Sequence, residues 1–283
     1  MAFFGPGGNE EQFYEQGYKS SDDMPEYLSG LGLNAYEYQC TRGVKINQKT
    51  SEKLGENARK FGIKLSIHAP YYINPATDDE EKRQKGIKYI TDTLCAAKHM
   101  GAERIVVHSG GCAKMPRSTA LQYAKKTLRL ALRSAEKIGC ADIFICPETM
   151  GKINQLGTLD EVLELCSMDE RLLPTIDFGH INARGLGCLN TPEDFELIFN
   201  KIENKLGLYR LENFHSHYSR IEFTDGGEKR HYTFNDIQYG PEFLPIAEII
   251  ARRKLNPTVI CESAGNMAHD SVKLKNMYLS FCG

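Results

Sequence analysis

The sequence predicts one α/β domain of the (β/α)8 barrel class, spanning residues 1–283. Eight short apolar runs recur at intervals of about 30 to 45 residues, and runs of this length indicate strands buried on both faces. Amphipathic segments that often end in glycine lie between them. An alternation of eight strands and helices over this length favours a closed parallel barrel.

The expected strands share an apolar, β-rich composition. They are MAFFG at 1–5, NAYEYQ at 34–39, KLSIHA at 64–69, RIVVHS at 104–109, DIFICPE at 142–148, LPTIDF at 173–178, NFHSHYS at 213–219 and PTVICES at 257–263. An open doubly wound sheet is the competing architecture. It would usually carry a glycine fingerprint after its first strand, and GPGGNEE at 5–11 lacks the required spacing.

The segments between the strands have helical periodicity. In residues 80–101, Ile87, Ile90 and Leu94 fall on one stripe, and residues 118–139 show the same pattern. Gly101 and Gly139 end these segments, and a glycine just past a helix tolerates the left-handed conformation. The sequence therefore predicts helices that cover the outside of a barrel.

Composition narrows the functional classes. The formal net charge of -2 gives no global attraction to nucleic acid, and no apolar stretch is long enough to cross a membrane. The nine cysteines form no CxxC pair, and the N-terminus does not resemble a secretion signal. We expect free thiols, a cytoplasmic location and a monomer.

Six successive strands end in a side chain that can bind a metal ion. These residues are His68, His108, Glu148, Asp177, His215 and Glu262. The carboxyl ends of barrel strands meet at one rim, where active sites lie. His180 follows Asp177 by three residues, and His231 follows the seventh strand in an expected loop. Packed imidazoles and carboxylates without thiolates indicate zinc, manganese or iron, and eight ligands are enough for two or three ions.

The motifs in these strands resemble the endonuclease IV family of apurinic/apyrimidinic endonucleases. SIHAPYYIN, VVHSGG, PETMG, TIDFGHINARG, RHYTF and CESAG occur in the family's order and spacing, from about residue 60 to 265. The resemblance implies a TIM barrel that binds three zinc ions. It also implies base excision repair, in which the enzyme cleaves the phosphodiester 5′ to an abasic site in double-stranded DNA.

The resemblance also implies a ligand set and a role for Glu148, which would bridge two zinc ions and orient the attacking hydroxide. His68 and His108 would complete the first zinc site, Asp177, His215 and Glu262 the second, and His180 and His231 the third.

The third site departs from the family pattern. The family has an aspartate two residues before the histidine of this loop, and here that position is Lys229. A lysine cation is not a plausible metal ligand. Glu228 could replace the aspartate, or His217 could, because alternation places it on the same face of its strand as His215. If neither does, two zinc ions are expected.

The DNA-binding residues are also altered. Tyr71 and Tyr72 follow the third strand and could stack in the gap left by a lesion. The loop after the second strand is shorter than the family's, and Arg42 is its candidate wedge residue. Five further basic residues could line a phosphate track: Lys114, Arg117, Arg184, Arg220 and Arg230.

The sequence alone leaves two other functions open. A sugar isomerase or epimerase of the wider xylose isomerase-like superfamily would share the barrel and rim ligands such as Glu148, Asp177, His215 and Glu262. It would use one or two divalent ions. A metal-binding or DNA-binding protein without catalytic activity is the third possibility.

Overall fold

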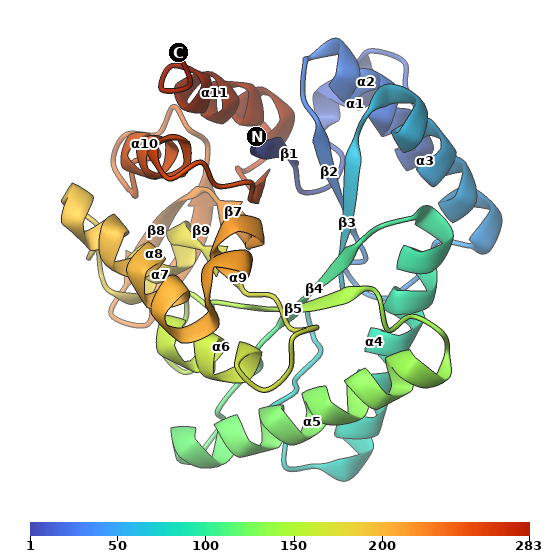
Figure 1. Cartoon of the computed structure of the whole chain (residues 1–283), viewed down its shortest axis with the longest axis vertical. Helices are drawn as coiled ribbons and strands as arrows, with labels where there is room; N and C mark the ends of the chain where they lie inside the picture. Colours follow the sequence, from blue (N-terminus) through green and yellow to red (C-terminus); the bar gives the residue numbers. More distant parts are fainter.

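The computed structural model describes residues 1–283 and contains a parallel eight-stranded barrel enclosed by helices (Figure 1). The barrel strands are β1 (Phe3–Pro6), β2 (Ala35–Gln39), β3 (Lys64–His68), β4 (Arg104–His108), β5 (Phe144–Glu148), β6 (Thr175–Asp177), β7 (His215–Tyr218) and β10 (Thr258–Cys261). Seven of them lie within the run expected from the sequence, and β1 extends one residue beyond its run, to Pro6. The (β/α)8 prediction is therefore confirmed.

The strands are ordered β1-β10-β7-β6-β5-β4-β3-β2, and all hydrogen-bonded neighbours are parallel. Closure occurs between β1 and β2, where the Gly8 amide donates to the Glu37 carbonyl at 2.9 Å. Gly5 makes this approach possible, because a Cβ at this position would lie 1.7 Å from the Ala35 carbonyl oxygen. The sheet thus surrounds a closed interior.

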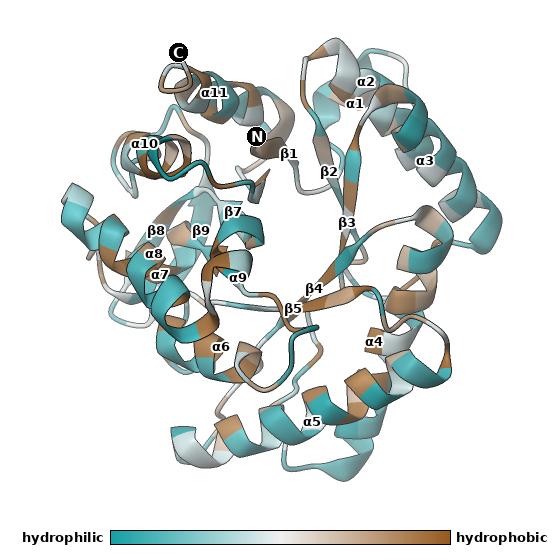
Figure 2. Cartoon of the chain, in the orientation of Figure 1, coloured by the Kyte–Doolittle hydropathy of each residue, from teal (hydrophilic) through white to brown (hydrophobic).

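The helices form the outer layer. They are α1 (Glu11–Glu15), the 3-10 turn η1 (Ser21–Asp23), α2 (Met24–Gly30), α3 (Gln48–Phe61), α4 (Glu80–Met100), α5 (Arg117–Lys137), α6 (Leu159–Cys166), α7 (Phe178–Arg184), α8 (Pro192–Leu206), α9 (Leu208–Asn213), α10 (Leu244–Arg252) and α11 (Met267–Leu279). In Figure 2, β4 and β5 are mostly apolar, whereas α5 alternates between apolar and polar positions. One apolar cluster of 62 buried residues joins the barrel to this layer, as expected for one domain.

Helix ends follow the expected local chemistry. Gly62 ends α3 and Gly101 ends α4, both with positive φ. Thr191 caps α8 by accepting a hydrogen bond from the Asp194 amide. None of the helices combines the length and the hydropathy needed to cross a bilayer.

The sequence did not predict the antiparallel hairpin of β8 (Arg220–Thr224) and β9 (Gly227–Tyr232). It stands outside the barrel sheet and occupies the segment expected to be a loop before His231. Its strands carry many polar residues, so they lack the apolar signature of the barrel strands. The hairpin nevertheless places two of the side chains discussed below.

Candidate metal centre

The carboxyl ends of the barrel strands bring most of the expected polar residues to one rim. His68 is the last residue of β3, and His108 is the last residue of β4. Glu148 ends β5, and Asp177 ends β6. Glu262 follows β10 directly. Because the strands are parallel and in register, these side chains converge over the same end of the barrel.

Glu148 lies at the centre of this rim. Its Oε2 is 3.4 Å from His68 Nε2 and 3.5 Å from His108 Nε2. Its Oε1 is 3.1 Å from His217 Nδ1 and 3.4 Å from His180 Nδ1. The residue is only 1% exposed, and a carboxylate buried this deeply needs compensating partners. With one oxygen facing each pair of histidines, Glu148 is placed to be shared between two cations.

Five overlapping groups of ligand atoms result. One of them, His68 with His217 and Glu262, only recombines members of two others, and one contains Glu37 and His215 below the rim; the remaining three adjoin one another. Within each group the atoms lie within 4.8 Å of one another. The first group is His68, His108 and Glu148, the second is Glu148, Asp177, His217 and Glu262, and the third is His180, Glu228 and His231. Nitrogen and carboxylate ligands in sets of three or four suit zinc and other first-row divalent ions.

Hydrogen bonds fix the orientation of the histidine rings. Three histidines place Nδ1 against a backbone carbonyl, which leaves Nε2 directed toward the cluster. The pairs are His68 with Ala69 at 2.7 Å, His108 with Tyr71 at 2.9 Å and His180 with Thr149 at 2.9 Å. A second ring nitrogen held in this way is typical of metal-binding histidines, because it sets the tautomer.

Asp177 supplies a buried oxygen without a hydrogen-bond partner. Its Oδ1 caps α7 by accepting from the His180 amide at 2.8 Å. Its Oδ2 accepts no hydrogen bond, although the residue is 0% exposed, and its one charged neighbour is His180 Nδ1 at 3.2 Å. A buried carboxylate oxygen without a hydrogen bond is costly unless a cation lies close to it. The residues of the second group therefore fit a metal ion.

The structure places His215 outside these three groups. His215 is the first residue of β7 and pairs in register with Thr175, whereas His217 pairs with Asp177. Two residues along a strand correspond to about 6.6 Å. His215 therefore lies one layer deeper in the barrel, and His217 occupies the rim position expected for His215. Alternation correctly placed both rings on one face, but it could not show which one reaches the rim.

A β-bulge brings Glu228 to the third group. Glu228 pairs with Phe223, and His231 pairs with Ile221. Residues that pair across a hairpin share a face, and Phe223 and Ile221 are two apart on β8. Glu228 and His231 therefore face the same side, although an odd spacing of three would place them on opposite sides of a regular strand. The extra residue is Lys229, because the register shifts between Glu222 and Phe223.

Lys229 points away from the ligands. Its Nζ lies 2.6 Å from Glu222 Oε1, and its side chain is 56% exposed. On the other face of the hairpin, Glu228 Oε2 lies 3.4 Å from His180 Nε2, and Oε1 lies 3.7 Å from His231 Nε2. Of the two replacements considered for the family's aspartate, the structure brings Glu228 to His180 and His231, and it brings His217 to the second group.

Two glycines let the hairpin dock against the loop after β5. The Glu228 amide donates to the Gly151 carbonyl at 3.0 Å. A Cβ on Gly151 would lie 2.6 Å from Glu228 Cβ and 2.9 Å from His180 Cδ2, and a Cβ on Gly227 would lie 2.2 Å from the Gly151 oxygen. Gly227 also has a positive φ of 87°. This close approach holds Glu228 beside His180.

The charges of the rim are mutually dependent. Burial opposes ionisation of Glu148, but the surrounding histidines, His217 first, hold its pKa well below the usual range. Burial also opposes protonation of His217, yet Glu262, Glu37 and Glu148 together raise its pKa well above the ordinary value. Without metal ions, protons on the imidazoles thus balance the buried carboxylates. Divalent ions would supply the same positive charge.

Most of the chain matches one protein family. The model of the xylose isomerase-like TIM barrel family aligns with residues 25–274. The chain belongs to this family. An uncharacterized protein of Methanocaldococcus jannaschii is 33% identical over 253 residues, which cover 89% of this chain and 90% of that protein.

Other relatives of this xylose isomerase-like barrel carry more specific names. A probable endonuclease 4 of Mycoplasma pneumoniae is 31% identical over 169 residues, and the alignment spans 58% of this chain and 55% of that protein. Among solved structures, endonuclease IV from Thermus thermophilus aligns with a TM-score of 0.65 at 19% identity, covering 94% and 95% of the two chains. A D-tagatose 3-epimerase-like protein aligns with a TM-score of 0.69 at 24% identity, covering 88% and 90%. These structural likenesses show the fold.

A cavity of about 320 Å³ opens over the metal groups of this xylose isomerase-like barrel. His68, His108, Glu148, His180, Glu228, His231 and Glu262 all line it. Lys152, in the loop after β5, is the only cationic lysine or arginine among the lining residues. The sequence analysis missed Lys152, because one lysine in a loop gives no signal of its own. Its ammonium group is available to an anionic substrate above the metal groups.

The three residues expected to bind DNA lie together at the rim. Tyr71 is 50% exposed and lines the cavity. Tyr72 is 44% exposed, stacks edge to face on Tyr71, and donates its hydroxyl to the Arg42 carbonyl. This contact joins the loops after β2 and β3. Tyr71 and Arg42 therefore keep the accessibility that DNA contact would require.

Three of the five residues expected to line a phosphate track are held by other parts of the protein. Arg117 donates to both carboxylate oxygens of Glu161, and Arg184 donates to backbone carbonyls of the loop after β5. Arg220 is 4% exposed and pairs with Glu242. These three guanidinium groups have structural partners. Lys114 and Arg230 are exposed.

Proposed function

We propose that this protein is a zinc-dependent endonuclease that hydrolyses the phosphodiester 5′ to abasic sites in double-stranded DNA. The observation that carries the proposal is the set of three adjoining ligand groups with Glu148 shared between two of them. A site for one cation would need only three or four ligands. The third group, formed with the hairpin, adds a separate ligand set that a one-metal reaction does not require.

The nine ligands fit three zinc ions. His68, His108 and Glu148 would hold the first, Glu148, Asp177, His217 and Glu262 the second, and His180, Glu228 and His231 the third. Bound there, adjacent zinc ions would supply a hydroxide nucleophile at neutral pH and would offset the charge on the attacking and leaving oxygens. This chemistry suits in-line displacement at phosphorus.

The chain's own residues would position the substrate and the nucleophile. Each oxygen of Glu148 faces a different pair of histidines, so this carboxylate can accept a hydrogen bond from the attacking water and hold it over the rim. Lys152 borders the same cavity and can pair with a non-bridging phosphate oxygen. Tyr71 borders it as well and can stack where the base is missing.

An oligonucleotide duplex with one tetrahydrofuran abasic analogue tests the proposal. The zinc-loaded protein is expected to nick the strand 5′ to the analogue, and buried zinc should let the reaction survive a brief exposure to EDTA. Glu148→Gln should lose most of this activity, because the amide cannot bridge two cations. Absence of cleavage by protein shown to contain its full complement of zinc would refute the proposal.

One observation supports a second candidate function. Glu148, Asp177, His217 and Glu262 form a complete four-ligand group by themselves, and the sequence resemblance links such a set to sugar isomerases and epimerases. One divalent ion in this group, with the other two groups empty, would favour proton transfer on a ketose. Assays of ketose epimerisation on protein containing one manganese or magnesium ion per chain would detect it.

A further inference from the structure

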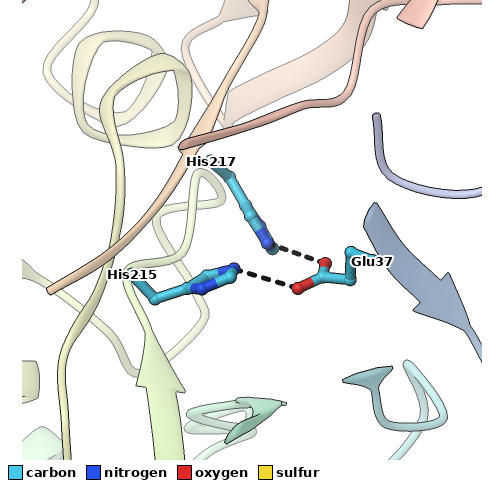
Figure 3. A group of neighbouring side chains, drawn as sticks. All are labelled: Glu37, His215 and His217. Carbon is cyan, nitrogen blue, oxygen red and sulfur yellow. Dashed lines mark hydrogen bonds and ion pairs between the residues drawn. The ribbon is translucent and has the colours of Figure 1, made fainter. Parts of the chain in front are cut away.

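A second cluster of ionisable side chains lies deeper in the barrel than the metal groups. Glu37, from the middle of β2, faces His215 and His217 of β7 (Figure 3). One carboxylate oxygen lies 2.9 Å from His217 Nε2, and the other lies 2.9 Å from His215 Nε2. All three residues are 0% exposed. The proposed function makes no use of Glu37 or His215.

The carboxylate of Glu37 is held on both oxygens. Ser66 donates its hydroxyl to Oε2 at 2.8 Å, and Gln39 donates its side-chain amide to Oε1 at 3.2 Å. These bonds and the two imidazoles restrict rotation of the carboxylate. An ionised carboxylate in a barrel interior is costly unless it is paired, so its cost must be offset by this fixed arrangement.

His217 is oriented oppositely to the other histidines of the rim. Its Nε2 faces Glu37, and its Nδ1 lies 3.1 Å from Glu148 Oε1 and 3.7 Å from Glu262 Oε2. His68, His108 and His180 instead give Nδ1 to a backbone carbonyl and direct Nε2 to their ligand groups. Glu37 is the acceptor that can fix a hydrogen on Nε2 of His217 and leave the Nδ1 lone pair toward Glu148.

We propose that Glu37 and His215 are a positioning pair that holds His217 as an Nδ1 ligand of the second metal group. This inference rests on the proposed metal centre and adds which ring nitrogen of His217 faces the metal. Glu37 accepts the Nε2 hydrogen of His217, and the His215 ring lies against the other oxygen at 2.9 Å, without hydrogen-bond geometry, where it limits turning of the carboxylate. Carboxylate–histidine–metal arrangements of this kind orient the ring and raise its basicity.

The same three residues are not a fourth cation site under this proposal. His217 has two ring nitrogens, and Nδ1 already faces Glu148 and Glu262. An additional ion held by all three residues would need His217 Nε2 as a ligand as well, and His217 would then be a fully deprotonated imidazolate bridge. Accepting the Nε2 hydrogen at Glu37 needs no such species.

Nitrogen-15 spectroscopy of the wild-type protein labelled at histidine and loaded with zinc tests the orientation directly. We expect His217 to carry its hydrogen on Nε2, and His68, His108 and His180 to carry theirs on Nδ1. Hydrogen on Nδ1 of His217 would overturn the inference. This measurement needs no variant, so it holds even if substitutions in the interior prevent folding.

Glu37→Gln provides the functional test, because glutamine keeps the volume but removes the charge and one of the two carboxylate oxygens that face the histidine rings. We expect zinc affinity of the second group to fall about 10-fold to 100-fold in chelator competition, with the circular dichroism of the metal-free protein unchanged. Ser271→Ala is the matched control, since it removes one buried hydroxyl, which donates to the Met267 carbonyl within α11, and leaves every contact of Glu37 in place.

The outcomes separate the two proposals. Wild-type affinity in Glu37→Gln, together with wild-type zinc binding, would refute the positioning role alone. Four zinc ions per wild-type chain would refute it in favour of a fourth site. A wild-type chain that binds no zinc would remove the proposed metal centre itself.

Discussion

Replacing Glu228 with glutamine removes one charged ligand from the third metal group and tests how the protein dispenses with the family's aspartate. The carboxylate lies 3.4 Å from His180 Nε2 and 3.7 Å from His231 Nε2, and it is 17% exposed. The His180 and His231 imidazoles lower its pKa to about 2 despite its burial, so it is ionised at neutral pH. The substitution therefore removes a full negative charge from the group.

The size of the effect follows from that charge. Two unit charges about 4 Å apart interact by about 4 kcal/mol at an effective dielectric constant of about 20. Since about 1.4 kcal/mol corresponds to a factor of ten, the affinity of the third group should fall by up to about 1,000-fold. The glutamine oxygen or a water will recover part of this, so we expect a loss of about 100-fold to 1,000-fold.

Chelator competition and native mass spectrometry measure the effect. At a free zinc concentration that saturates the wild type, Glu228→Gln should retain two zinc ions while the wild type retains three. Lys229→Met is the matched control, because Lys229 points to Glu222 on the other face of the hairpin and should not affect the zinc count. Three ions bound with wild-type affinity in Glu228→Gln, or loss of one ion in Lys229→Met, would refute this reasoning.

Four further predictions concern the same rim. Gly151→Ala should displace Glu228 and selectively weaken the third zinc site. Gly226→Ala is the control, because its Cβ would meet only Thr224 Oγ1 at 3.7 Å. Equal zinc counts in the two variants would contradict the docking of the hairpin against the loop after β5. Lys152→Met should lower kcat/KM for abasic DNA about 10-fold without changing the zinc count, with exposed Lys137→Met as the control. Zinc loading at pH 7 should release protons from the histidines. Burial lowers the pKa of His68, but the nearby carboxylates, Glu148 first, together have the larger effect and raise this pKa to about 9. The pKa values of His180 and His217 are raised as well. These raised histidine pKa values stabilise the metal-free protein fully below pH 6.5, and this contribution to the free energy of unfolding is lost as the pH rises through about 9. The Tm of the metal-free protein should therefore fall over this range. Proton release near zero, or a Tm that rises from pH 7 to 9, would contradict this assignment.

The barrel could be predicted because its strands are buried on both faces. Runs such as RIVVHS and DIFICPE have few alternatives to a parallel interior strand, and the polar residue that follows each run marks the rim. The rim position of Glu148 follows from the same pattern. Helix ends at Gly62 and Gly101 were equally visible, because a left-handed residue is required there.

The seventh strand shows the limit of this pattern. The sequence FHSHYS offers two histidines on one face, and alternation cannot decide which layer each occupies. The register with β6 decides it, because Asp177 pairs with His217. Likewise, Glu37 is an acid inside the apolar strand segment AYEYQ. Its partners come from β7, far away in the sequence, so the local pattern could not show what it contacts.

The hairpin of β8 and β9 could not be predicted from the sequence for a different reason. Whether Glu228 or Lys229 faces His231 depends on one extra residue in the pairing of β8 with β9. Such a bulge changes the face of every residue beyond it and leaves no trace in composition. Under the proposed metal centre, the position that looked like a lost ligand is therefore a change of register, and the residue before it, Glu228, offers the carboxylate.

The number of metal ions bound to each chain tests the central claim most directly. Native mass spectrometry of the protein purified without chelators, supported by elemental analysis, should give three zinc ions per chain, one for each ligand group. A single ion, held by the four-ligand group of Glu148, Asp177, His217 and Glu262, would contradict the account of a three-zinc phosphodiesterase.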